Sequence, residues 1–227
     1  MSKLSEELQI RIDAYNASIE LYNIKKSAAI EEMVDTGRIY TDEGFIEVLD
    51  GRLNGFKEDF EVNAEKINFR INEIIRSEKE KHFKKNDSRS DQAAKISNAL
   101  RFLEIEGSEI DDEKAFLILK DFMDDMDTMT LFKSAIERQL GPYGKAEIHS
   151  FTKTFGHYNE RAALLNTFQQ MEAIAKDLFT RPLTALQRSI LRSREFVHNH
   201  CPAYSDTADQ TTLIDLAEIV ENMTDTE

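Results

Sequence analysis

The chain has 227 residues, with 29 Lys or Arg against 43 Asp or Glu and a formal net charge of −14. Such acidity argues against sequence-independent binding of DNA or RNA, which needs a basic surface, and the single cysteine, Cys201, cannot form an intramolecular disulfide. The N-terminus has no signal-peptide pattern and no apolar run approaches the roughly 18 residues of a membrane span, so we expect a cytoplasmic protein without a membrane anchor.

The first predicted element is a helix over residues 2–36. Its apolar residues, among them Leu8, Ile12 and Tyr15, recur at spacings of three and four and so lie on one face. Gly37 is expected to end it. The chain has only 8 Gly and 3 Pro, a scarcity that favours long uninterrupted helices.

The second predicted helix runs from a cap at Thr41 to about Lys85 and has the most regular apolar pattern in the sequence. A spacing near 3.5 residues is typical of a coiled-coil seam. So long a helix needs cover along its length, so we expect either residues 2–36 folded back as a hairpin or a second chain beside it, in a homodimer or higher oligomer. The residues predicted to form this seam are Phe45, Leu49, Phe56, Phe60, Ile67, Ile71 and Ile74.

A polar stretch, KKNDSRSD at residues 84–91, interrupts the apolar pattern. We take it as a boundary, which predicts a helical hairpin or coiled-coil rod at 1–86 and a C-terminal helical bundle at 91–227. No segment alternates with period two, so the predicted fold class is all-α.

The helices of the second part are predicted to be shorter. Asp111 is a suitable cap for one of them, and the sequence GPYG after Leu140 predicts a turn. A short helix over 145–155 and a separate helix that begins at Asn159 are expected next.

The sequence LRSREFVHNHCPAY, residues 191–204, resembles the motif of HEPN-domain ribonucleases, all-helical proteins with an Arg and a His four to six residues apart on a late helix. Five residues separate Arg192 from His198, and five separate Arg194 from His200. The resemblance implies that these arginines position a phosphate and that these histidines assist chemistry at the ribose 2′-oxygen. The alternative is an ordinary helix end, where Arg and His interact favourably with the helix dipole.

Metal ligation is not predicted in this stretch, because His198, His200 and Cys201 lack the second pair of ligands that a zinc site needs. No cofactor-binding motif was found elsewhere in the sequence.

Residues 104–127 are strongly acidic, but they do not match a calcium-binding loop, since Thr130 and Ile136 stand where such a loop counted from Asp125 needs Gly and Glu. Two interpretations are open: a solvated face, or a docking surface for a basic partner, as in an inhibitor that imitates nucleic acid. The carboxylates of this acidic face are Asp111, Asp112, Asp121, Asp124, Asp125 and Asp127.

The acidic, cysteine-poor and helical character of the chain is similar to that of bacteriophage capsid-assembly proteins of the scaffolding type. The segment from Gln92 to Phe132 is similar in style to helical accessory proteins of phage structural modules. The resemblance implies a coat-type protein as partner, a location in the host cytoplasm or the virion, and no catalysis. The leading hypothesis from the sequence is therefore a non-enzymatic helical assembly protein.

Overall fold

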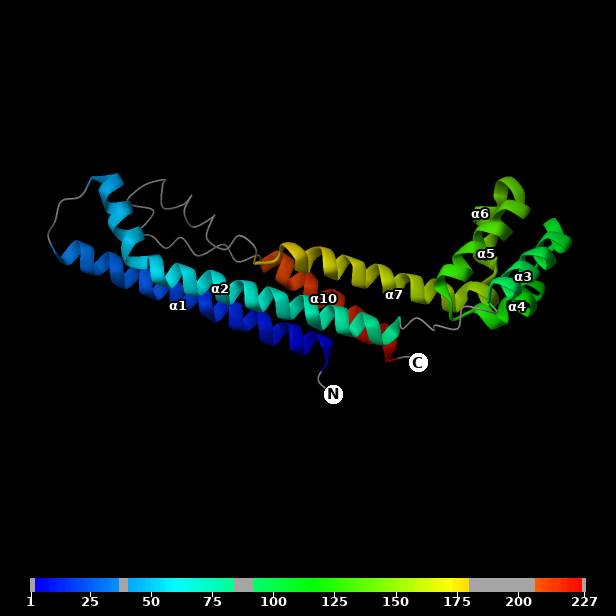
Figure 1. Ribbon diagram of the computed structural model, residues 1–227, viewed down its shortest axis with the longest axis horizontal. Coiled ribbons are helices and arrows are strands. Elements are labelled where there is room, and N and C mark those ends of the chain that lie inside the picture. Colours follow the sequence, from blue (N-terminus) through cyan, green and yellow to red (C-terminus); the bar gives the residue numbers. More distant parts are fainter. Residues whose placement is uncertain (1–2, 37–40, 84–91, 180–206, 226–227) are drawn as a thin grey trace. The chain divides into compact units, whose positions relative to one another are not determined.

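The computed structural model describes residues 3–36, 41–83, 92–179 and 207–225, and in these ranges all regular secondary structure is helical (Figure 1). The predicted all-α class, with a long N-terminal hairpin and a smaller helical domain after it, is confirmed. By their internal contacts the residues form two compact units. Unit 1 consists of Met1–His82 and Thr167–Glu227, and unit 2 of Phe83–Asn166.

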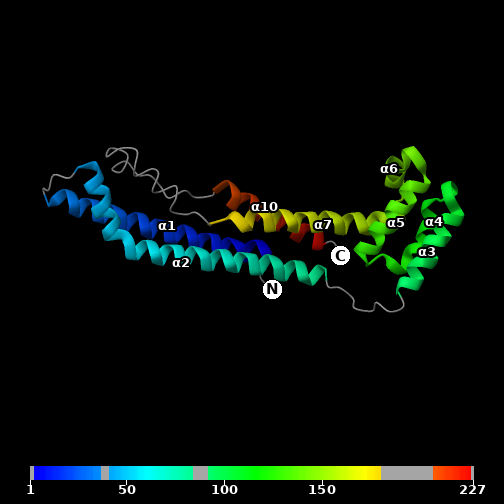
Figure 2. The ribbon, with the colours of Figure 1, turned by 45° about the horizontal axis from the view of Figure 1, so that its top comes forward.

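Unit 1 is built on a hairpin of α1 (Leu4–Asp35) and α2 (Asp42–His82), which lie side by side and antiparallel (Figures 1 and 2). The predicted cap at Thr41 is present, because its hydroxyl accepts a hydrogen bond of 3.2 Å from the Gly44 amide. Farther along, the Asn63 amide donates to the Ser18 hydroxyl at 2.7 Å, which helps to fix the register of the two helices.

The last described helix, α10 (Thr207–Thr224), runs antiparallel along α1. The Ser5 amide donates to the Glu221 carboxylate at 2.7 Å, and Asn16 and Gln210 exchange side-chain hydrogen bonds of 3.2 and 3.3 Å. The predicted division at 1–86 and 91–227 grouped this helix with the second part of the chain, whereas its contacts lie with α1.

An aromatic cluster occupies the middle of unit 1. The ring of Phe60 lies 5.9 Å from that of Tyr15 and 5.6 Å from that of Tyr22, measured between centroids. Phe179, two residues beyond the end of α7 (Thr152–Asp177), stacks on Tyr15 at 3.5 Å and has a left-handed φ of 64°. A bulky residue rarely adopts this conformation, so its packing must offset the backbone strain.

Unit 2 contains α3 (Gln92–Glu106), α4 (Asp112–Leu119), α5 (Met126–Gln139), α6 (Gly144–Glu147) and the first part of α7. Short 3-10 turns connect them at Gly107–Glu109, Lys120–Phe122, Gly141–Tyr143 and Ile148–Ser150. Its core consists of Ala99, Leu103, Ile110, Ala115, Leu119, Phe122, Met129, Phe132, Ile136, Ile148, Phe151 and Phe155.

The predicted separate helix from Asn159 is wrong, because α7 runs without interruption from Thr152 to Asp177. Asp112 explains the earlier start: its carboxylate accepts hydrogen bonds from the amides of Lys153 at 2.8 Å and Thr154 at 2.9 Å. These amides belong to the first turn of α7 and have no partner within that helix. The cap therefore comes from another helix and is not visible in the local sequence.

Candidate interaction surfaces

The predicted seam of α2 is largely covered within the chain. Most of its members are buried, which leaves them inaccessible to a second chain unless the hairpin opens. The alternative in which residues 2–36 fold back on the second helix is therefore the one that the structure contains. The buried members of the predicted seam are Phe45, Leu49, Phe60, Ile67 and Ile71.

Two members of the predicted seam are placed differently. Phe56 is 46% exposed, with the Lys25 ammonium 5.5 Å from its ring centroid, and Lys57 is buried in its place and pairs with Asp50. Ile75 is fully buried, whereas Ile74 lies at the edge of the seam.

The reason is the helical period. From Phe45 to Ile75 the buried positions advance 30 residues in eight steps, or about 3.75 residues a step, which is nearer to the 3.6 of a straight helix than to 3.5. Burial lowers the pKa of the Lys57 ammonium, an effect that the nearby Glu61 carboxylate partly opposes.

Half of the predicted acidic face serves to cap helices. Asp111 accepts a hydrogen bond of 2.9 Å from the Lys114 amide at the start of α4, and Asp125 accepts one of 3.1 Å from the Thr128 amide at the start of α5. Asp112 caps α7. These carboxylates are held at helix N-termini, where negative charge stabilises the structure.

The other three carboxylates of the acidic face, Asp121, Asp124 and Asp127, are exposed. The Asp124 carboxylate lies 3.8 Å from the His157 imidazole. Three exposed carboxylates are too few to define a docking surface, so the docking interpretation stays a prediction.

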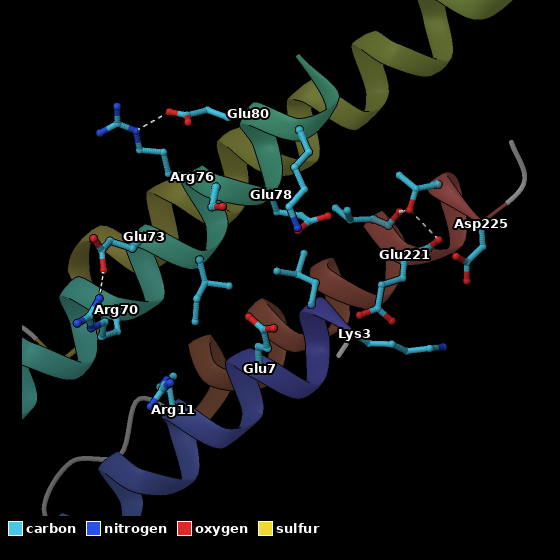
Figure 3. Close-up of a pocket in the computed structure, with 16 residues that line it drawn as sticks. Lys3, Glu7, Arg11, Arg70, Glu73, Arg76, Glu78, Glu80, Glu221 and Asp225 are labelled. Carbon is cyan, nitrogen blue, oxygen red and sulfur yellow. Dashed lines mark hydrogen bonds and ion pairs between the residues drawn. The ribbon is translucent and has the colours of Figure 1, made fainter. Parts of the chain in front are cut away.

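An open cleft of about 1380 Å³ lies in unit 1 between the start of α1, the end of α2 and the end of α10 (Figure 3). Five cationic and six anionic side chains line it. The cations on α2 already have partners on the same helix: Arg70 pairs with Glu73 at 2.5 Å, Arg76 with Glu80 at 2.8 Å, and Lys81 with Glu78 at 2.5 Å. Because charges of both signs line it and the cations on α2 are paired, the cleft presents no cluster of one sign that would favour an anion or a cation.

A second apolar stripe runs along α1 on the face opposite to the seam. Each of its members follows a buried residue by two positions, which corresponds to a rotation of about 200° around the helix. All are exposed, and Ile10, Leu21 and Ile24 are 58%, 58% and 64% exposed. We call this set the outer stripe. Its members are Ile10, Ala14, Ala17, Leu21, Ile24 and Ala28.

The outer stripe was not predicted from the sequence, although its signal was present. The spacing of 4, 3, 4, 3 and 4 is that of the first and fourth positions of a heptad. Two stripes on one helix cancel in any measure of one-sided amphipathicity, so the more apolar inner face alone was recognised.

The proposed nuclease residues Arg192, Arg194, His198 and His200 lie outside the described residues, so that assignment stays a prediction. Arg76 and His82 share their spacing, but Arg76 pairs with Glu80, and the His82 imidazole lies 3.5 Å from the Glu78 carboxylate. In the described ranges, no group of three or more His, Cys, Asp or Glu side chains is arranged to hold a metal ion.

None of the helices that the structure describes combines the length and the apolar character needed to cross a membrane. Comparison of the chain with protein-family models, with curated proteins and with solved structures gave no match.

Proposed function

We propose that the chain is a non-enzymatic helical assembly protein, which works by binding other protein chains along α1 of unit 1. The observation that carries this proposal is the outer stripe, six apolar residues in helical register on the side of α1 away from its own hairpin partner. Single exposed apolar side chains are ordinary, but a continuous stripe is typical of an interface.

The chemistry of the described residues also supports a binding role. The cleft of unit 1 is lined by charges of both signs, and polar side chains such as Asn16 and Gln210 serve the packing of α10 on α1. Three carboxylates of the acidic face stabilise the fold by capping helices, namely Asp111, Asp112 and Asp125.

The test is the loss of association in a variant of the outer stripe. Leu21→Glu places a charge at the middle of the stripe, and Val34→Glu is the matched control, because Val34 is 53% exposed on the same helix but lies off the stripe. Association would be measured by light scattering of the purified full chain, alone and mixed with candidate partners. The proposal predicts that Leu21→Glu abolishes binding to any protein and Val34→Glu does not. Equal association of the wild type and both variants contradicts it.

The finer form of the proposal is a scaffolding-type role, in which the partner is a coat-type protein. Its support is the acidic, cysteine-poor and helical character of the chain, with 43 acidic residues and one cysteine. Coat subunits from the same source would be assembled with and without the protein and examined by electron microscopy. Shells of unchanged size and yield would contradict this form.

A further inference from the structure

We infer that the outer stripe of α1 binds the outer stripe of a second copy of this chain, with the two α1 helices parallel. The inference rests on the proposed function, because it names the occupant of the same surface. It adds the identity of the partner, the direction of the helices and the residues that face one another.

The apolar register of the stripe fits a parallel pair. Ala14, Leu21 and Ala28 take the first position of successive heptads, and Ile10, Ala17 and Ile24 take the fourth. In a parallel two-stranded arrangement each such residue meets its own counterpart, so Leu21 would face Leu21 of the second copy. The alanines allow the two backbones to approach closely, while the three larger side chains supply the apolar contact.

The charges that flank the stripe are segregated by sign. Glu6, Asp13 and Glu20 lie along one side of it, and Arg11, Ser18 and Lys25 lie along the other. In parallel helices, the side chain just before one heptad faces the side chain five residues later on the other helix. Glu6 would therefore face Arg11 of the second copy, and Glu20 would face Lys25, so both charged pairs attract.

An antiparallel arrangement of the same stripes brings like charges together. The acidic side of one helix would then lie along the acidic side of the other, and the basic side along the basic side, which is unfavourable. In a parallel pair, a two-fold axis along α1 therefore brings the acidic side of each helix to the basic side of the other. A second copy of this chain supplies all the charges that this arrangement needs.

Two of these charged residues have no competing partner in their own chain. Within the described ranges neither Arg11 nor Glu20 makes a hydrogen bond or an ion pair, and both are exposed. Lys25 lies over the Phe56 ring at 5.5 Å, a contact that leaves an ammonium free to approach a carboxylate. Because α2 covers the opposite face of α1, pairing through the outer stripe leaves the hairpin intact.

The first experiment is sedimentation velocity on the full chain over a range of concentrations. The wild type and Val34→Glu should sediment with twice the chain mass of 26.2 kDa, and Leu21→Glu and Ile24→Glu with the single mass. Circular dichroism would verify that the helix content of each variant is unchanged.

Reversal of a single charge determines the direction of the helices. Lys25→Glu replaces two symmetric attractions by repulsions in a parallel dimer and should weaken dimerisation about tenfold. In an antiparallel dimer the same change would relieve repulsion among basic residues and strengthen association. The double variant Glu20→Lys with Lys25→Glu should restore the wild-type dissociation constant.

A disulfide gives an independent measure of direction. In a Cys201→Ser background, Ala28→Cys should form an interchain disulfide readily, because the two residues at position 28 lie at the same level in a parallel pair. Antiparallel helices would separate them by about 27 Å at 1.5 Å per residue. The control is Val34→Cys, which lies off the stripe.

A wild type that stays monomeric, or a dimer that persists in both Leu21→Glu and Ile24→Glu, overturns the inference. So does stronger association of Lys25→Glu. A monomeric wild type that binds a different protein through the same stripe would overturn the second copy as occupant but leave the proposed function standing. A wild type that neither dimerises nor binds another protein through the outer stripe would overturn both this inference and the proposed function.

Discussion

The side-chain amide of Asn68, in the C-terminal half of α2, donates a hydrogen bond of 2.5 Å to the backbone carbonyl of Leu178, just beyond the end of α7. A second bond of 2.7 Å reaches the carbonyl of Ala175. The last carbonyls of a helix have no partner within it, so this one side chain satisfies two of them. It holds the end of α7 where Phe179 turns into its left-handed conformation and stacks on Tyr15.

Asn68→Ala should therefore lower the free energy of unfolding by about 1–3 kcal/mol, because the Leu178 carbonyl loses its donor and the Ala175 carbonyl keeps only a longer bond, of 3.4 Å, from the Asn72 side chain. Asn54→Ala is the control: it lies on the same helix but is exposed and donates only to the Glu58 side chain, at 3.2 Å. Urea denaturation followed by circular dichroism would measure both. Equal losses in the two variants would show that the bonds from Asn68 are not a special source of stability.

The cap of α5 should make stability depend on pH. Burial alone raises the pKa of Asp125, but hydrogen bonds from Thr128 and Gln92 outweigh it, so the pKa lies below its ordinary value of 3.8. The cap contribution is then complete above pH 3.8, where the unfolded carboxyl is ionised, and is lost as the pH falls through the lower pKa of the folded protein.

Asp125→Ala should cost about 1–2 kcal/mol of stability at pH 7, and this difference from the wild type should shrink below pH 3.8. Urea denaturation at a series of pH values would measure it. Asp124→Ala is the control, because its side chain is 90% exposed and caps no helix. The difference in stability between Asp125→Ala and the wild type could instead stay constant down to about pH 2, roughly two units below the pKa of the unfolded carboxyl. That result would contradict the role of an ionised cap.

Tyr22 should reduce stability at high pH. Burial, with a further contribution from the Glu61 carboxylate, raises the pKa of Tyr22 from 10.0 to about 12, and its hydroxyl has no hydrogen-bond partner in the described part of the chain. Between these values the unfolded tyrosine ionises first, so the folded state loses relative stability as the pH rises from 10 toward 12.

Tyr22→Phe should flatten this decline and should match or slightly exceed the wild-type stability at pH 7, since it removes a buried hydroxyl without a partner. Tyr143→Phe, at a position that is 72% exposed, should leave the decline unchanged. Denaturation curves at pH 7 and above pH 10 would distinguish the two variants. A decline in Tyr22→Phe as steep as in the wild type would assign it to other groups.

Close backbone packing at Gly144 predicts a further sensitive position. A methyl group there would meet the carbonyl oxygen of Glu137 and come within 2.8 Å of its carbonyl carbon. Gly144→Ala should therefore destabilise unit 2 by roughly 1–3 kcal/mol. Gly156→Ala, in the interior of α7 with nothing within 4 Å, should instead stabilise by about 0.5–1 kcal/mol. Thermal unfolding of both variants would test this contrast, and shifts of the same sign would contradict it.

The sequence was sufficient to predict those parts of the fold that local chemistry determines. The caps at Thr41 and Asp111 and the burial of Leu49, Phe60 and Ile71 follow from residue type and spacing. Spacing could not decide whether the seam is covered by the same chain or by another, because both cases need the same apolar residues.

Long-range partners explain what was missed at the candidate surfaces. In the sequence, Asp112 and Asp121 are both members of one acidic run, and nothing local distinguishes their roles. In the structure, Asp112 caps a helix that begins 40 residues later, whereas Asp121 is exposed. Likewise, Lys57 replaces Phe56 in the seam because the pairing of α1 and α2 selects the phase of the helix. No window along the sequence contains that information.

The hydrogen bond between Ser5 and Glu221 has a consequence for the nascent chain. Unit 2 is one continuous stretch and can fold once it has left the ribosome, but unit 1 needs segments from both sides of it. The side of α1 that packs against α10 stays exposed until α10 has been synthesised. During translation this uncovered surface of α1 is open to chaperones and to contacts with neighbouring nascent chains.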